Sequence, residues 1–126
     1  MAPDPLILAL DIGTSSTRAM LFTGQAQPLP EFTVQVPLQM ETTVDGGATF
    51  AAERLFEAVV ATIDQLLQKL GSRPAEIVAV TCDTFVGNVF GVTAAGTPTT
   101  PVFTYADTRN AADVEQIRAE LGPAGC

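Results

Sequence analysis

The sequence predicts one α/β domain built on a mixed sheet, in which three antiparallel strands are followed by a helix and then by a parallel strand. Three features lead to this prediction: an apolar run ending in a glycine- and hydroxyl-rich turn, a long segment of helical period, and a second apolar run after that segment. The chain has 126 residues. This length suffices for one domain with a core and is too short for two.

The amino-terminal part is expected to hold the antiparallel strands. Residues 6–10 are continuously apolar, as in a strand buried on both faces, and residues 19–22 are expected to form the next strand. Residues 32–36 alternate apolar and polar side chains, which is typical of a half-buried strand. Residues 24–30, with two prolines, are predicted to be a turn, and residues 37–49 a loop with an Asp-Gly-Gly turn signal.

Residues 50–70 are the clearest predicted helix. Thr49 is suited to the N-cap, and Gly71 follows the last apolar residue as a stop signal. The apolar residues recur at a helical period, so the helix should cover one face of the sheet. They are Ala52, Leu55, Phe56, Val59, Ile63, Leu66, Leu67 and Leu70.

The carboxy-terminal part begins with a second fully apolar strand at residues 77–82. This strand should return parallel to the first through a right-handed crossover. Shorter strands are predicted around residues 88–92 and 102–105, and a last helix from about Asn110 to the Gly122-Pro123 stop. This order of elements is that of the ribonuclease-H-like, or actin-like ATPase, fold.

The charge balance excludes several classes of partner. Six basic and 14 acidic residues give a net charge of −8, which argues against nucleic acid or an anionic membrane as partner. No apolar run approaches the roughly 20 residues of a membrane span, and no signal peptide is expected, so we expect a cytoplasmic protein. Histidine is absent and the two cysteines are Cys82 and Cys126. We expect no disulfide and no cysteine–histidine metal site, and Cys82 should be a small buried hydrophobe.

The turn after the first strand has the chemistry of a phosphate-binding loop. Asp11 ends the strand and is followed by Gly13, Thr14, Ser15 and, after two more residues, Arg18. Free amides of a turn form an anion-binding concavity, and a carboxylate at a strand end suits a hydrated Mg²⁺. The turn is neither a Walker A loop nor a G-x-G-x-x-G loop. An ordinary hairpin turn is the alternative, because these residue types are common in turns.

Three segments resemble the amino-terminal part of the FGGY carbohydrate kinases, which include glycerol, xylulose, ribulose and gluconate kinases. They are LALDIGTSSTRAMLF, AVTCDTFVGNVFGV and TPVFTYADTRNA. A loop similar to that of the first segment also occurs in other actin-like ATPases, whereas the aromatic–x–Asp–x–Arg box of the third segment is more specific. In that box Tyr105 stands where the family more often has tryptophan.

The resemblance implies ATP and Mg²⁺ as cofactors. Asp11 would position the Mg²⁺, and the β- and γ-phosphates of ATP would be faced by the turn residues Gly13, Thr14, Ser15 and Arg18. Arg18 could instead be a surface side chain on a strand.

The resemblance also implies a sugar substrate, of the gluconate or pentulose type. Asp83, Thr84 and Phe85 match the region that touches the sugar, although xylulokinases typically have Met-His at the last two positions. Asp107 and Arg109 would line or brace the sugar pocket. Alternatively, Asp83 caps the turn after its strand, Thr84 and Phe85 pack between domains, and Asp107 caps the last helix with Arg109 in its first turn.

In the resembled family the catalytic aspartate and the adenosine pocket lie beyond residue 126. Residues 1–126 are therefore expected to be an incomplete amino-terminal sugar-binding domain, inactive alone and prone to self-association as a homodimer. An actin-like ATPase that activates a partner dehydratase is a second hypothesis, but its iron–sulfur cluster needs cysteines in a suitable setting. A third is a non-catalytic module for sugar binding or assembly.

Overall fold

The computed structural model describes residues 4–122 and has a four-stranded main sheet. Its strands follow the order β3-β2-β1-β6. β2 is antiparallel to both β1 and β3, whereas β6 is parallel to β1. The predicted strand directions and the parallel return after the helix are thus confirmed. The bounds are Leu6–Ile12 for β1, Ser16–Thr23 for β2, Pro28–Pro37 for β3 and Ile77–Thr84 for β6.

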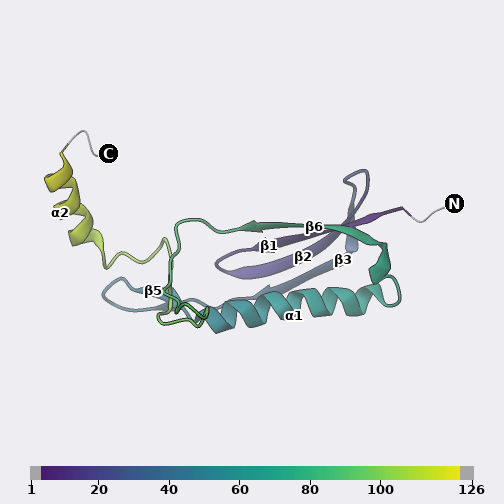
Figure 1. The fold of residues 1–126 in the computed structure, drawn as a ribbon, viewed down its shortest axis with the longest axis horizontal. Coiled ribbons are helices and arrows are strands. Elements are labelled where there is room, and N and C mark those ends of the chain that lie inside the picture. The colour runs from purple at the N-terminus through teal and green to yellow at the C-terminus, as the bar shows by residue number, and fades with distance from the viewer. Residues whose placement is uncertain (1–3, 123–126) are drawn as a thin grey trace.

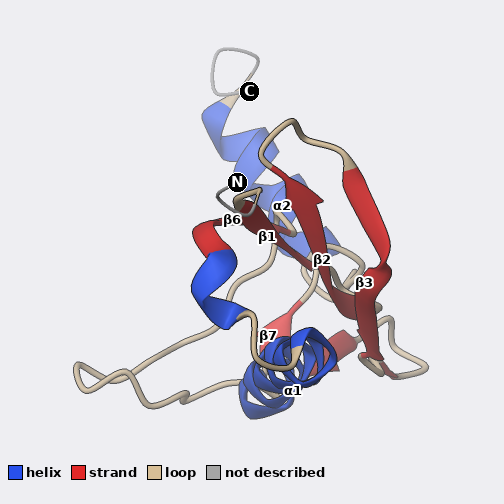
Figure 2. Ribbon diagram, turned by 90° about the vertical axis from the view of Figure 1, so that its right-hand side faces the viewer, coloured by secondary structure: helices blue, strands red, loops and turns tan. Residues whose placement is uncertain are grey.

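Helix α1 (Ala52–Leu70) packs on one face of the main sheet (Figure 2). The core between them consists of Leu6, Leu8, Ala19, Leu21, Val34, Leu66 and Leu70. The predicted carboxy-terminal stop is confirmed, because the Gly71 amide donates to the carbonyls of Leu67 and Gln68. The predicted apolar stripe is correct only in part, since Phe56 is 70% exposed.

The predicted start of α1 is wrong. Its N-cap is Ala51, which makes no side-chain cap, and not Thr49. Thr49 and Phe50 belong to a second, three-stranded sheet, where they pair with the strand at residues 102–103. The sheet has the order β4-β5-β7, with β4 at Glu41–Thr42, β5 at Ala48–Phe50 and β7 at Val102–Phe103. It replaces part of the loop predicted at residues 37–49. Residues 88–92 contribute isolated bridges at Val89 and Val92 in place of the predicted strand.

Strand β3 is longer than predicted, and it includes the two prolines of the predicted turn. Pro28 and Pro30 were expected in a turn, yet β3 runs from Pro28 to Pro37. The strand is at the edge of the sheet, and its pairing with β2 shifts register between Met20 and Leu21. An edge position and an irregularity are the two settings in which a strand accommodates proline.

The expected burial of strand β6 is wrong. Along β6, Val78 is 67% exposed and Val80 is 60% exposed, and Cys82 is also exposed. Helix α1 covers β2 and β3, and no strand within residues 4–122 pairs with the outer edge of β6. No element in the described part of the chain therefore covers these apolar side chains of β6. Cys126 lies outside the described residues.

The remaining elements are a 3₁₀ turn, Pro74–Glu76, and helix α2, Ala111–Leu121, which has no buried residue. Figure 1 shows α2 projecting from the end of the molecule opposite the amino terminus. The β1–β2 turn, the carboxyl end of β6 and the second sheet lie toward that same end. Among the described residues, no helix is both long and apolar enough to cross a bilayer.

Candidate functional site

The turn between β1 and β2 is a tight hairpin that leaves amides available. The Gly13 amide donates to the Ser16 carbonyl at 2.9 Å, and a side chain at Gly13 would crowd that carbonyl at 3.1 Å. In residues 4–122, no backbone carbonyl accepts from the amides of Thr14 or Ser15. Both amides are free for an anion, as a phosphate-binding turn requires.

Side chains after the turn point to opposite faces of the sheet. Thr17 is buried and donates its hydroxyl to the Ala58 carbonyl of α1 at 3.1 Å. Its neighbour Arg18 lies within strand β2 and on the opposite face, where its guanidinium contacts the amide oxygen of Gln35 at 3.5 Å. The prediction placed Arg18 in the turn, whereas it is the third residue of strand β2.

Four polar residues form a row across the uncovered face of the main sheet. Gln35, Arg18, Asp11 and Asp83 are successive pairing partners on β3, β2, β1 and β6. Directly paired residues project their side chains from the same face. Asp11 and Asp83 are both exposed and lie near the carboxyl ends of two parallel strands. The sheet therefore places two carboxylates side by side next to the β1–β2 turn.

The segment after β6 turns inward at Phe85. The Asp83 carboxylate accepts the Thr84 amide at 2.9 Å, a local bond of the kind expected if Asp83 caps its turn. The Phe85 amide donates to the Ile12 carbonyl at 3.1 Å. The Phe85 ring packs edge-on against Phe50, with 6.1 Å between centroids. Phe85 is thus half-buried in the second apolar cluster, while Thr84 is exposed.

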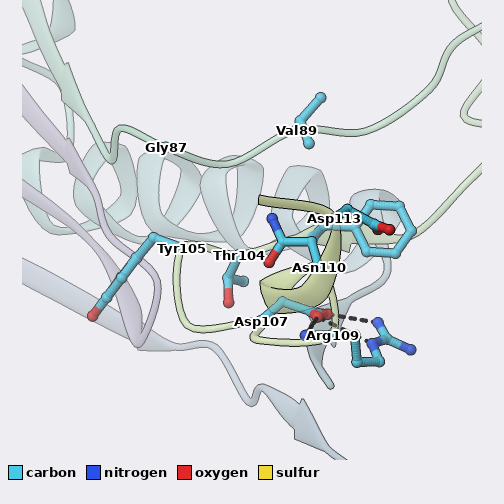
Figure 3. A pocket seen from close by; sticks show the side chains of 9 residues that line it. Gly87, Val89, Thr104, Tyr105, Asp107, Arg109, Asn110 and Asp113 are labelled. Atoms are coloured by element: carbon cyan, nitrogen blue, oxygen red, sulfur yellow. Dashed lines mark hydrogen bonds and ion pairs between the residues drawn. The ribbon is translucent and has the colours of Figure 1, made fainter. Parts of the chain in front are cut away.

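A cavity of about 670 Å³ lies between the segment after β6 and the start of α2 (Figure 3). Asp107 and Arg109, which the resemblance assigned to the sugar pocket, line it together with Tyr105, Asn110 and Asp113. The rest of the lining is Gly87, Val89, Phe103 and Thr104. The sequence prediction missed Asn110 and Asp113, although both follow the Asp–x–Arg box within one helical turn.

Within this cavity Asp107 and Arg109 brace each other. The Arg109 Nε donates to Oδ1 at 3.0 Å and Nη2 donates to Oδ2 at 2.5 Å. The Asp107 carboxylate also accepts the amide of Ala48 at 3.1 Å and that of Arg109 at 3.2 Å. The Arg109 side chain and, to a lesser degree, the Ala48 amide hold the pKa of Asp107 well below its usual range. Asp107 therefore anchors the box to β5 and does not cap α2, whose N-cap is Asn110.

The glycine turn at residues 45–47 holds the same box from the other side. The amide and the hydroxyl of Thr108 both donate to the Gly46 carbonyl, at 2.9 and 3.3 Å. The sequence offered only a turn signal here, because nothing local indicates contact with a segment 60 residues away. This contact brings the second sheet and the Asp–x–Arg box together.

Comparison with known proteins gives one family. The profile described as "FGGY family of carbohydrate kinases, N-terminal domain" matches residues 6–124. The chain is 27% identical over 115 residues to the gluconokinase of Bacillus subtilis, which covers 91% of this chain and 22% of that protein.

Solved kinases share the fold. The gluconate kinase of Lactobacillus acidophilus superposes with a TM-score of 0.81 at 21% identity, over 94% of this chain and 23% of that one. The xylulose kinase of Rhodospirillum rubrum gives 0.82 at 21% identity, over 91% and 23%. The predicted ribonuclease-H-like, actin-like ATPase fold is confirmed, and this chain spans less than a quarter of the length of these relatives. By its match to the amino-terminal domain profile, the chain belongs to the FGGY family of carbohydrate kinases.

Proposed function

We propose that this chain supplies phosphate- and sugar-binding groups to an enzyme that transfers the γ-phosphate of ATP to a hydroxyl of a sugar or sugar acid. The observation that carries the proposal is the β1–β2 turn, whose free Thr14 and Ser15 amides follow closely on Asp11 near the end of β1. Phosphoryl transfer depends mainly on positioning and on stabilising negative charge, which are the two things that this turn can provide. The gluconokinase and xylulose kinase relatives favour a gluconate- or pentulose-type substrate.

The donor set near the turn fits Mg²⁺. Asp11 and Asp83 offer exposed carboxylate oxygens at neighbouring strand ends, and Mg²⁺ takes one or two carboxylates while keeping most of its waters. Bound with ATP, the ion would neutralise charge on the transferring phosphoryl group. In this proposal Asp11 holds the hydrated ion, and Gly13, Thr14 and Ser15 face the phosphates. Arg18 adds a fixed positive charge from the adjacent strand.

The cavity beside Asp107 is the proposed sugar site. Carboxylate, guanidinium, amide and phenol groups offer complementary acceptors and donors to the hydroxyls of a polyol. Asp107 and Arg109 brace this wall. Asp83 and Thr84, which the resemblance also assigns to the sugar, do not line the cavity and precede the Gly87 and Val89 segment that does. Phe85 supports the segment through its contact with Phe50.

Further parts of the assignment stay predictions. In the resembled family the catalytic aspartate lies outside the segment that matches this chain, so the chain alone is predicted to turn over no ATP in response to sugar. A cytoplasmic location and a homodimer are likewise predictions. The family match favours a sugar kinase over an activator of a partner dehydratase.

The test is a pair of NMR titrations of the isotope-labelled chain. Mg²⁺–ATP should shift the amide signals of Thr14 and Ser15, and gluconate or xylulose should shift signals of residues around Asp107. A non-catalytic sugar module would respond to sugar but not to nucleotide. If the turn signals stay unchanged at saturating Mg²⁺–ATP while the hairpin is folded, the proposed kinase function fails.

A further inference from the structure

The turn that holds the Asp–x–Arg box occurs three times in this chain with the same hydrogen bonds. In each copy a threonine amide donates to the carbonyl four residues later, the fourth residue donates back to the threonine carbonyl, and the fifth donates to the threonine hydroxyl. The fourth residue has a positive φ in every copy, of 60°, 91° and 81° in chain order. The copies are residues 23–27, 43–47 and 93–97.

The residue type at the fifth position differs among the three turns, and the shared turn geometry does not explain the difference. It is Gln27 in the first copy, Gly47 in the second and Thr97 in the third. Two copies therefore accept a full side chain there, one of them β-branched. The turn geometry does not require glycine at this position.

Two side chains, those of Thr43 and Arg109, leave no room for a Cβ at position 47. A Cβ built on Gly47 would overlap the Thr43 hydroxyl of the same turn, and it would lie 3.0 Å from Cζ and 3.1 Å from Nε of Arg109. The guanidinium plane of Arg109 is fixed on its other sides by Asp107 and by the Phe103 ring, whose centroid is 5.8 Å from Cζ. A side chain at residue 47 would therefore displace the Thr43 hydroxyl and press on the guanidinium, which would have to move by a few tenths of an ångström.

The third position of the turn also differs. It is Gln25, Asp45 and Ala95 in the three copies, so the turn does not require a carboxylate there. The pKa of Arg109 is raised chiefly by its hydrogen bond to Asp107, with smaller contributions from the charges of Asp107 and Asp45. The Asp45 carboxylate accepts the Thr43 hydroxyl, which lies next to Gly47, so Asp45 adds negative charge on the Gly47 side of the guanidinium.

We propose that Gly47 and Asp45 are positioning residues that set the Arg109 guanidinium, and through it Asp107, in the wall of the candidate sugar cavity. The expected effect on sugar binding rests on the proposed function, because the position of Arg109 affects a kinase only if this cavity binds the sugar. The placement of Arg109 itself can be tested without sugar.

The test compares Gly47→Ala with Thr97→Ala, which changes the same position of the third turn. The Nε–Hε NMR signal of Arg109, assigned with Arg109→Lys, should move in Gly47→Ala, and the pKa of Asp107, followed by carbon NMR, should rise toward its ordinary value. Thr97→Ala should leave both unchanged. Gluconate or xylulose binding, measured by equilibrium dialysis, should weaken roughly tenfold in Gly47→Ala only, as expected for one charged hydrogen bond.

A second variant covers the case in which Gly47→Ala does not fold. Asp45→Asn keeps the shape of the turn, removes the charge, and should move the Arg109 signal less than Gly47→Ala does. Unchanged Arg109 and Asp107 signals in the folded variants, or equal changes in Thr97→Ala, would overturn the inference. If the unaltered chain binds no sugar at all, the assigned sugar site fails, while the two signals still decide the role of Gly47.

Discussion

The hydroxyl of Thr17, in the strand that leaves the candidate phosphate turn, donates to the carbonyl of Ala58 in the middle of α1, across 41 residues of sequence. The hydroxyl of Thr62 joins the same cluster and also donates to Ala58. All three residues are buried. These hydrogen bonds connect the start of β2 to α1, and they therefore help to fix the position of the turn that carries the free amides of Thr14 and Ser15.

Thr17→Val should destabilise the chain by about 1 kcal/mol, the usual net value of one buried hydrogen bond. The valine methyl group preserves the side-chain volume, and the Thr62 hydroxyl still donates to the Ala58 carbonyl. The loss of stability should therefore not exceed the value of one hydrogen bond. Urea unfolding followed by circular dichroism measures it. The control is Thr42→Val, an exposed threonine of β4, and a loss in the control as large as in Thr17→Val would contradict this role.

Asp11→Asn should weaken Mg²⁺-dependent ADP binding by about tenfold or more, because it removes a charged ligand interaction. Binding of ADP without Mg²⁺ should change little, since the amides of the turn stay in place. Calorimetric titration with and without Mg²⁺ separates the two effects. Asp83→Asn tests the paired carboxylate, and Asp64→Asn on α1 is the control for loss of charge alone. If all variants bind ADP with equal affinity in the presence of Mg²⁺, Asp11 does not bind the metal ion.

The elements that the sequence predicted well are those whose signal is local. β1, the body of α1 and the parallel return of β6 follow from runs and periods that one segment carries by itself. The second sheet could not be predicted in this way, because Thr49 and Phe50 have a helix-like neighbourhood in sequence and are drawn into a strand by Val102 and Phe103.

The candidate site shows the same division. The Asp11–Ser15 turn could be predicted because its chemistry is contiguous. The brace around Arg109 joins Asp107 to the amide of Ala48, 59 residues away, and only the folded chain reveals it. The burial expected for Cys82 was wrong for a related reason, since apolar composition predicts that a strand needs cover and does not say which segment provides it.

Asp107 should give stability a defined pH dependence. Its pKa in the folded state is lowered by the Arg109 side chain and the Ala48 amide, so the ionised form is favoured in the native state. The contribution is fully present above the unfolded-state pKa of about 3.9 and is lost as the pH falls below it toward the folded-state value. Asp107→Asn should remove this part of the acid sensitivity. Urea midpoints at pH 7 and pH 3 measure it, with Asp64→Asn as control; an undiminished acid loss in Asp107→Asn alone would disprove the assignment.

Strand β6 should make the isolated chain self-associate. Its outer edge is unpaired within residues 4–122, its valines are exposed, and its only charge is Asp83. An exposed apolar edge strand is a template for pairing with another chain, and a lysine on it opposes that pairing. Val80→Lys should therefore shift the chain toward monomer in sedimentation-velocity experiments. Val44→Lys adds the same charge at an exposed valine away from the sheet edge and should leave the distribution unchanged. If both variants dissociate the assembly equally, net charge is responsible and the edge of β6 is not.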